Sequence, residues 1–146
     1  MTTIEYRRCK DLSTSADITY RNMRPYYEYH SVNWDQDTIL GAISSLENWD
    51  IIVQGQVIGA LRLAFDVEGC YLRDLQVCED FQNKGIGAKS LQQSKNLALQ
   101  SGAAKLRLRV MKISPAFKLY KREGFAVTAE DEKFYYMEQS LKEESV

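Results

Sequence analysis

The chain has 146 residues, with 19 basic and 20 acidic side chains and a net charge of -1. Hydrophobic residues make up 45% and charged residues 27%, which is typical of a folded globular chain and excludes intrinsic disorder. This balanced charge gives no overall attraction to nucleic acid or to an anionic membrane, so neither is expected as a partner. The length favours a single domain over residues 1–146.

The N-terminal sequence and the cysteines favour a cytoplasmic, metal-free protein. No stretch approaches the roughly 20 apolar residues of a membrane span, and residues 1–12 lack the apolar core of a signal peptide. Cys9, Cys70 and Cys78 are widely spaced, so they form neither a disulfide framework nor a Cys-x-x-Cys metal pair. His30 is the single histidine, and a zinc site is therefore not expected.

Apolar periodicity and turn residues predict strands and helices along the chain. Pro25 should kink or end the first helix, because proline removes a backbone donor. Asp35 or Asp37 can cap the second helix, and Gly55 supplies the positive φ that a hairpin turn needs. In chain order the expected elements are a strand at 4–7, a helix opening at 13–15, a second helix carrying 39–46, a hairpin of 50–53 and 56–65, a strand at 71–77, a helix at 85–101, a strand at 105–110, a helix from 115 to 124 and a final strand at 134–137.

The order of these elements indicates the fold class. Read as βααβββαβαββ, it has too few crossovers for a doubly wound parallel sheet. Residues 105–110 alternate cleanly, with Leu106, Leu108 and Val110 on one face, as in a half-buried strand. We therefore expect an α+β fold with a mixed, mostly antiparallel sheet.

Residues 82–87, Gln-Asn-Lys-Gly-Ile-Gly, form a glycine-rich turn between a predicted strand and a predicted helix. Glycines let the backbone approach a bulky anion, and the free N–H groups at a helix start favour negative charge. Two common phosphate fingerprints fail: Ala88 separates Gly87 from the Lys89-Ser90 pair of a Walker loop, and Ser90 replaces the third glycine of the dinucleotide motif. A glycine turn without a ligand stays open as the alternative.

Residues 114–125 carry a second pattern, Ser-Pro-Ala-Phe-Lys-Leu-Tyr-Lys-Arg-Glu-Gly-Phe. On its own it predicts a short amphipathic helix that packs Phe117, Leu119 and Tyr120 on the sheet and ends at Gly124. Taken alone, this segment therefore needs no function beyond the core.

Together the two segments resemble the GNAT superfamily of acyl-CoA-dependent N-acyltransferases. The family's first signature, Q/R-x-x-G-x-G/A, is matched by residues 82–87. Its second signature, A-x-x-L-Y-x-x-x-G-F, is matched about thirty residues later by Ala116, Leu119, Tyr120, Gly124 and Phe125. The resemblance is close over residues 51–141 and looser over the strand and helices that precede them.

The resemblance implies a sheet of about seven strands with helices on both faces, splayed in the middle where the pantetheine arm of acetyl-CoA inserts like a missing strand. Leu75 and Val77 would then pair by main chain with the pantetheine amides. Ser114 would be a further cofactor contact, at a position where many members carry the longer Asn. Backbone N–H groups would hold the CoA diphosphate at Gln82, Asn83, Lys84, Gly85, Ile86, Gly87 and Ala88.

The chemistry of the implied reaction assigns roles to two side chains. An ammonium has a pKa of about 10.4 and must lose a proton before it attacks a thioester. Asp74 could draw the ammonium in or accept its proton through water, although an outward charge paired with Arg73 or Arg107 explains it equally well. The departing thiolate needs a proton, and Tyr120 matches the family's general acid. The tetrahedral oxyanion needs a donor, commonly a backbone N–H group where the strands diverge.

The acceptor side is expected in the N-terminal helices, where aromatic and acidic residues gather. Tyr26, Glu28, Tyr29 and Trp34 could make a box for a cationic amine through cation–π and charge attraction. A plain contact between helices explains the same aromatics.

The sequence therefore predicts transfer of the acetyl group of acetyl-CoA directly to a primary amine of a small molecule or peptide, within a ternary complex and without a metal. Cys78 is not expected to form an acyl-enzyme, since no histidine is near it in sequence. The alternative is a non-catalytic acyl-CoA sensor or subunit, and a nucleotide enzyme is a weaker third option. If the chain forms a homodimer, the apolar residues 134–137 are the candidate for pairing.

Overall fold

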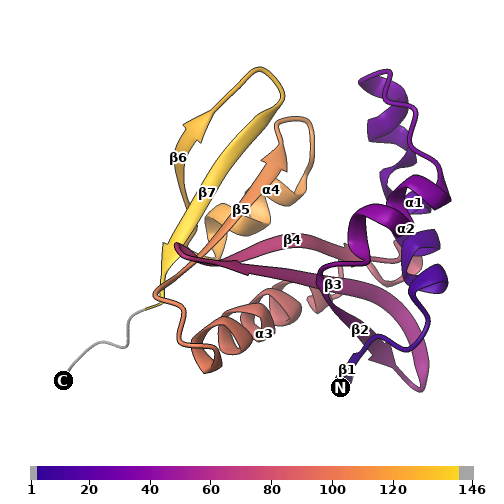
Figure 1. Ribbon diagram of the computed structural model, residues 1–146, viewed down its shortest axis with the longest axis horizontal. Coiled ribbons are helices and arrows are strands. Elements are labelled where there is room, and N and C mark those ends of the chain that lie inside the picture. Colours follow the sequence, from indigo (N-terminus) through magenta and orange to yellow (C-terminus); the bar gives the residue numbers. More distant parts are fainter. Residues whose placement is uncertain (1–2, 142–146) are drawn as a thin grey trace. The chain divides into compact units, whose positions relative to one another are not determined.

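A computed structural model describes residues 3–141 (Figure 1). The element order is the predicted βααβββαβαββ, with one added 3-10 turn, although of the two final strands only the one at 134–137 is assigned residues from the sequence. The elements are β1 (Ile4–Arg8), α1 (Leu12–Tyr29), α2 (Gln36–Ile43), β2 (Glu47–Val53), β3 (Gln56–Asp66), β4 (Gly69–Val77), η1 (Glu79–Phe81), α3 (Ile86–Gln100), β5 (Lys105–Met111), α4 (Ala116–Arg122), β6 (Ala126–Glu130) and β7 (Phe134–Ser140). Within residues 3–141, no helix is both long and apolar enough to cross a membrane.

The seven strands form one mixed sheet in the order β1-β2-β3-β4-β5-β7-β6, which confirms the predicted α+β fold class. The β4–β5 pair is parallel, and the β1–β2, β5–β7 and β6–β7 pairs are antiparallel. The parallel ladder joins only Cys70–Leu72 to Leu106–Leu108, although β4 continues to Val77 and β5 to Met111. The paired residues thus end before either strand does, and the splay that the resemblance implied stays a prediction.

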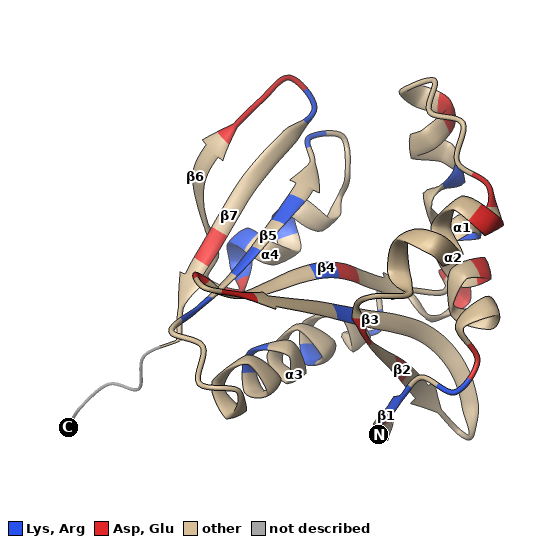
Figure 2. Cartoon of the chain, viewed as in Figure 1, with Lys and Arg blue, Asp and Glu red and all other residues tan. Residues whose placement is uncertain are grey.

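The chain divides into two compact units, and β3, β4 and α3 each contribute to both. The first unit comprises residues up to Arg62 together with Asp74–Gly87, and the second comprises Leu63–Arg73 and the residues from Ala88 onward. Acidic and basic residues are spread over the elements of both units, in keeping with the near-zero net charge (Figure 2). The single domain expected over residues 1–146 stays a prediction.

In the first unit, α1 and α2 lie against each other around an apolar cluster that includes Ala16, Ile39 and Ile43. Of the two cap candidates for α2, Asp35 is the cap, and its carboxylate accepts from the Thr38 N–H at 2.8 Å. The caps and the apolar spacing explain why these short sequences are helical.

Of the two outcomes expected of Pro25, the end of the first helix is wrong, because α1 runs on to Tyr29, and the kink stays a prediction. Proline removes only one backbone hydrogen bond, and two contacts stabilise the turn that follows it. Tyr27 packs against the apolar cluster between α1 and α2, and the His30 N–H donates to the Tyr26 carbonyl at 3.1 Å.

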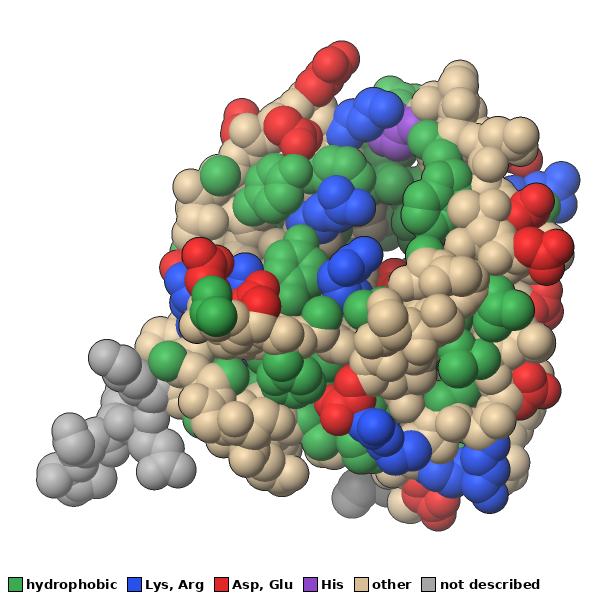
Figure 3. All heavy atoms as spheres, viewed as in Figure 1, with side chains coloured by type: hydrophobic (Ala, Val, Ile, Leu, Met, Phe, Trp, Pro, Cys, Tyr) green, Lys and Arg blue, Asp and Glu red, His purple; other side chains and the backbone are tan. Residues whose placement is uncertain are grey.

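In the second unit, the alternation predicted for residues 105–110 is confirmed. Leu106, Leu108 and Val110 are buried, while Arg109 on the opposite face is exposed. Figure 3 shows that opposite face over β5 and β7, where basic side chains lie among hydrophobic ones.

The apolar residues 134–137 lie in β7, which is an interior strand of the sheet. Its main chain pairs with β5 on one side and with β6 on the other, and the sheet edges are β1 and β6. Pairing of two copies through this segment as an edge strand is therefore wrong, because its backbone groups already have partners within the chain, and the homodimer itself stays a prediction.

Gly59 of β3 lies so close to β4 that a side chain at this position would require the strands to shift. A Cβ added at this position would overlap the carbonyl oxygen of Gln76 on β4. Because β3 and β4 approach this closely, Gly59 sets the path of β4 just before the glycine-rich turn.

We expect Gly59→Ala to lower the free energy of unfolding by about 2 kcal/mol, because the added methyl group forces the strands apart. Gly41→Ala is the control: Gly41 lies in α2 with no heavy atom within 4 Å of an added Cβ. That change should raise stability by up to about 1 kcal/mol through helix propensity. Urea unfolding of both variants measures the difference, and equal stabilities would contradict the argument.

Candidate functional site

The glycine-rich turn joins the end of β4 to the start of α3 through η1. Asn83 and Gly85 have positive φ values of 60° and 81°, and α3 begins at Ile86. The turn is exposed, and a Cβ added to Gly85 would meet no heavy atom within 4 Å. The backbone is therefore open to a bulky group at the position where the helix starts.

The start of α3 suits an anion. The first N–H groups of an α-helix have no acceptor within the helix, and the helix dipole favours negative charge there. The first turn of α3 has no acidic residue that would repel a phosphate. Lys84, whose Nζ lies 5.7 Å from the ring centroid of Phe81, adds an exposed cation at this end. These residues fit a diphosphate held by backbone groups.

The main-chain groups at the end of β4 have a defined direction. The Gln76 carbonyl faces Gly59 of β3, and the Cys78 N–H donates to the Ile58 carbonyl at 2.8 Å. Since backbone groups alternate sides along a strand, those of Leu75 and Val77 point away from β3. This is the orientation that pairing with an inserted extended group would need.

The Val77 carbonyl is also the meeting point of two side-chain amides. Asn22 of α1 donates to it at 2.9 Å, and Gln82 of the turn donates to it at 2.8 Å. A carbonyl oxygen accepts two hydrogen bonds, so this oxygen is satisfied. Any pairing of Val77 with a ligand would therefore use its N–H group rather than its carbonyl. Asn22 is a site residue that sequence reasoning missed.

Arg62 of β3 is fully buried, and every N–H group of its guanidinium has an acceptor. Nε donates to Asn48 Oδ1 at 2.9 Å, and Nη2 donates to the carbonyl and hydroxyl oxygens of Ser15 at 2.9 and 2.6 Å. Nη1 donates to Thr19 Oγ1 at 2.7 Å and to Asp74 Oδ2 at 3.0 Å. The side chain thus ties α1, β2 and β4 to β3.

Asp74, the predicted base, pairs with Arg62 and retains 25% side-chain exposure. The suggested pairing with Arg73 or Arg107 is wrong: Arg107 instead binds Asp66 at 2.6 Å and Glu68 at 3.1 Å. Asp74 is therefore a carboxylate fixed from one side by a buried guanidinium and open to solvent on the other.

The charges of Asp74 and Arg62 both affect the pKa of the Tyr27 hydroxyl. Burial raises the pKa of its hydroxyl to about 12, with the negative charge of Asp74 acting in the same direction and Arg62 opposing it. Tyr27 therefore stays protonated at neutral pH, and it can donate a hydrogen bond but not serve as a base.

Tyr120 is buried in α4, in the second unit, and its ring centroid lies 6.1 Å from that of Phe125 in an edge-to-face contact. The helix is short, and Pro115 precedes it as the cap residue. Ser114 supports this start, because its hydroxyl accepts from the Ala116 N–H at 3.2 Å. Ala88 also belongs to the second unit, near the start of α3.

The four predicted acceptor residues lie along the end of α1 and the segment after it. Glu28 pairs with Arg24 at 3.1 Å, and Tyr29 is exposed and contacts the His30 ring edge-on at 5.0 Å. Trp34 lies 6.0 Å from Tyr27, between ring centroids. In the part of the chain that the structure describes, no ring contact or hydrogen bond joins any two of Tyr26, Glu28, Tyr29 and Trp34. The aromatic box stays a prediction.

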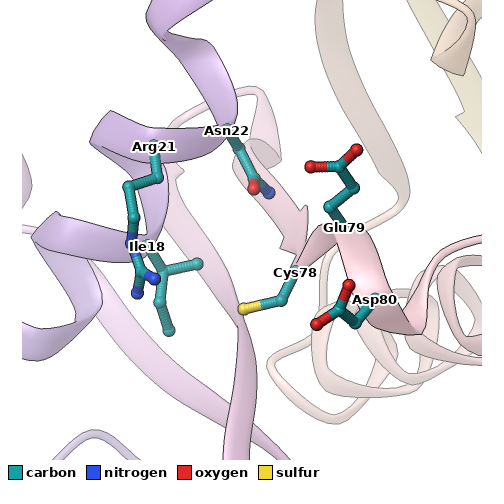
Figure 4. Close-up of a pocket in the computed structure, with 6 residues that line it drawn as sticks. All are labelled: Ile18, Arg21, Asn22, Cys78, Glu79 and Asp80. Carbon is teal, nitrogen blue, oxygen red and sulfur yellow. The ribbon is translucent and has the colours of Figure 1, made fainter.

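A pocket of about 230 Å³ opens beside the end of β4 (Figure 4). The Cys78 thiol points toward Ile18 in this pocket, and burial raises the thiol pKa, with Arg21 opposing and Asp80 reinforcing the shift. A raised pKa lowers the thiolate fraction at neutral pH, so Cys78 is a weak nucleophile. The lining residues are Ile18, Arg21, Asn22, Cys78, Glu79 and Asp80.

The match to a known family covers most of the chain, since residues 4–125 match the acetyltransferase (GNAT) family. The chain belongs to this family. The match includes both segments that carried the resemblance, the glycine-rich turn of residues 82–87 and the helix around Tyr120. No curated protein matches the sequence.

Solved structures with the same fold are distant in sequence from this GNAT protein. The PaiA N-acetyltransferase of Thermoplasma acidophilum, solved with coenzyme A, is 20% identical with a TM-score of 0.77, covering 94% of this chain and 99% of its own. Ard1 of Thermoplasma volcanium is 20% identical with a TM-score of 0.75, covering 96% and 99%. An acetyltransferase of Thermus thermophilus is 15% identical with a TM-score of 0.74, covering 94% and 97%. These likenesses show the fold.

In this GNAT protein, we expect Arg62→Lys to lower the free energy of unfolding by about 2 kcal/mol or more. A lysine ammonium has three donors and no planar fork, so buried acceptors would lose their partners. Arg24→Lys, which alters an exposed pair on α1, is the matched control and should stay within about 0.5 kcal/mol. Urea unfolding measures both variants, and an equal loss in the free energy of unfolding would contradict the role of Arg62.

Proposed function

We propose that this GNAT protein transfers the acetyl group of acetyl-CoA directly to a primary amine of a small molecule or peptide. The observation that carries the proposal is the turn before α3, where Asn83 and Gly85 take left-handed backbone angles and leave the helix start open. A diphosphate group bound there would be neutralised by backbone N–H groups rather than by net charge. The family match and the coenzyme A in the PaiA structure support this choice of anion.

The acyl donor would be held along β4 and the turn. The backbone from Gln82 to Ala88 would bind the diphosphate, and Leu75 and Val77, whose main-chain groups point away from β3, would pair with the pantetheine amides. Ser114 would contribute less than the Asn of many relatives, because its side chain is shorter. Lys84 would add a solvent-exposed charge near the phosphates.

Asp74 would act on the acceptor amine. Its carboxylate is held by Arg62 on one side and partly exposed on the other, so it can attract an ammonium ion. The ammonium must release a proton before the nitrogen attacks the thioester carbonyl, and the proton would pass to Asp74 through water or to bulk solvent. The box of Tyr26, Glu28, Tyr29 and Trp34 would attract the amine more weakly, because Glu28 is exposed and its charge is screened by water.

Collapse of the tetrahedral intermediate breaks the carbon–sulfur bond and releases the CoA thiolate. Tyr120 would donate its phenolic proton to that sulfur, and the phenolate would regain a proton from solvent. The raised pKa of the Cys78 thiol argues against an acyl-enzyme and favours transfer within a ternary complex.

Thiol release from acetyl-CoA, measured with and without a panel of primary amines and peptides, tests the proposal directly. We expect amine-dependent thiol release that matches formation of the N-acetylated product. Binding of acetyl-CoA without release of thiol for any amine would instead identify an acyl-CoA sensor or subunit.

We expect Tyr120→Phe to lower the rate of the chemical step by on the order of 10²-fold, because the leaving thiolate loses its proton donor. The affinity for acetyl-CoA should not change. Single-turnover kinetics and calorimetric titration separate the two effects. Full activity of the variant across the pH range would remove Tyr120 from the mechanism.

We expect Gly85→Ala to weaken acetyl-CoA binding about tenfold, since a Cβ strains a left-handed residue by about 1–2 kcal/mol and shifts the turn. The matched control is Gly102→Ala, beyond the other end of α3, where φ is 83° against 81° at Gly85 and an added Cβ also meets nothing within 4 Å. Both variants should lose similar stability, and only Gly85→Ala should bind acetyl-CoA less tightly. An equal loss of affinity in both would show that backbone strain alone is responsible.

A further inference from the structure

One face of the sheet in the second unit combines arginines with aromatic rings. The register pairs Tyr71 with Arg107 and Arg109 with Tyr136, so these side chains share a face. The opposite face carries the buried leucines of β4 and β5. We call this surface the arginine–aromatic face, and it consists of Tyr71, Arg73, Arg107, Arg109, Phe134 and Tyr136.

Rings support the guanidinium groups of this face. The Arg109 guanidinium carbon lies 4.3 Å from the centroid of the Phe134 ring, and that of Arg73 lies 6.0 Å from the centroid of Tyr71. A guanidinium stacked on an aromatic ring keeps its N–H edge free for an anion. Both cations therefore lie beside a ring that does not neutralise them, and Arg109 also forms a hydrogen bond with the Tyr136 side chain.

The carboxylates around the face already have partners. Asp66 and Glu68 bind Arg107, Glu138 pairs with Lys105 at 3.4 Å, and Asp131 accepts from the Tyr136 hydroxyl at 2.7 Å. Over residues 3–141, neither Arg73 nor Arg109 forms a salt bridge with a carboxylate, and both are exposed. Two arginine charges are therefore available, in a region where nearby carboxylates keep the total positive charge small.

The two arginines stand where the parallel ladder ends. Its last pair is Leu72 with Leu108, and Arg73 and Arg109 are the next residues on their strands. In the proposed reaction the acyl donor would insert beyond this point, where the resemblance to the family implies that the two strands diverge. Arg73 and Arg109 are therefore placed to contact a molecule that reacts at that point.

We infer that Arg73 and Arg109 bind a carboxylate of the acceptor, so that the amine to be acetylated belongs to a molecule with a free carboxylate, such as a peptide. The inference rests on the proposed function and specifies the acceptor of the same site. Guanidinium groups match carboxylates with two parallel hydrogen bonds. The modest local positive charge suits a singly charged carboxylate better than a doubly charged phosphate, and Phe134 and Tyr71 offer apolar surface beside it.

The test compares glycylphenylalanine with its C-terminal amide, two probes whose amines are alike and whose far ends differ by one charge. In equilibrium titrations of the full chain, the carboxylate form should bind about tenfold or more tightly, and raised salt should reduce that preference. The double variant Arg73→Gln/Arg109→Gln should bind both probes alike. Arg8→Gln is the control: it removes an exposed arginine of β1 that lies 5.3 Å from the ring centroid of Trp49 on β2. This variant should keep the preference for the carboxylate probe.

Each outcome bears on one of the two proposals. Equal binding of the two probes to the unaltered chain, or a preference that survives the double variant, overturns the carboxylate site. A rise in the KM for acetyl-CoA in the double variant, with the preference for carboxylate unchanged, would assign the arginines to a CoA phosphate instead. If the preference is present but no amine releases thiol from acetyl-CoA, the proposed transferase activity fails and the carboxylate site stands.

Discussion

The buried guanidinium of Arg62 is the interaction on which the first unit depends most. A charge removed from water is tolerated only when every donor finds an acceptor, and here five hydrogen bonds reach Ser15, Thr19, Asn48 and Asp74. Because those partners come from α1, β2 and β4, one side chain sets the positions of three elements relative to β3. Asp74 supplies the balancing charge, and the same contact orients its carboxylate. Stability of the unit and the geometry of the proposed amine site therefore share one set of hydrogen bonds.

Charge in this protein acts locally rather than through the total. The net charge of -1 gives no attraction to an anion, yet the turn before α3 offers backbone N–H groups that need no basic side chain. On the sheet of the second unit, Arg107 is neutralised by Asp66 and Glu68, while Arg73 and Arg109 rest on aromatic rings. Two anion-binding surfaces can thus exist in a chain with more acidic than basic residues.

The parts of the fold that depend on local pattern were predictable from sequence, and those that depend on distant partners were not. The alternation at residues 105–110 and the glycine-rich turn at 82–87 are local, and both the strand and the helix start appear where expected. The partner of Asp74 could not be found, because a buried arginine in an apolar strand looks like any surface arginine until the acceptors of α1 surround it. The continuation of α1 past Pro25 could not be predicted for a similar reason, since the packing of Tyr27 outweighs one lost backbone hydrogen bond. The contact between Asn22 and the Val77 carbonyl could not be predicted either, because nothing in the sequence distinguishes Asn22 from the other polar residues of α1.

The Val77 carbonyl oxygen, which accepts two hydrogen bonds, has a consequence for how the acyl donor and the acceptor affect each other's binding. Asn22 of α1 and Gln82 of the glycine-rich turn both donate to this one oxygen, which ties the two segments to the same point of β4. The two ligands are coupled if a ligand that orders the turn also restrains the helix that is expected to meet the acceptor. Restricting both segments at once makes the second binding event less costly in conformational entropy. Linkage requires the benefit to be mutual, so a bound acceptor would raise the affinity for the acyl donor by the same factor. A single backbone oxygen can in this way make the ternary complex more stable than its two binary complexes suggest.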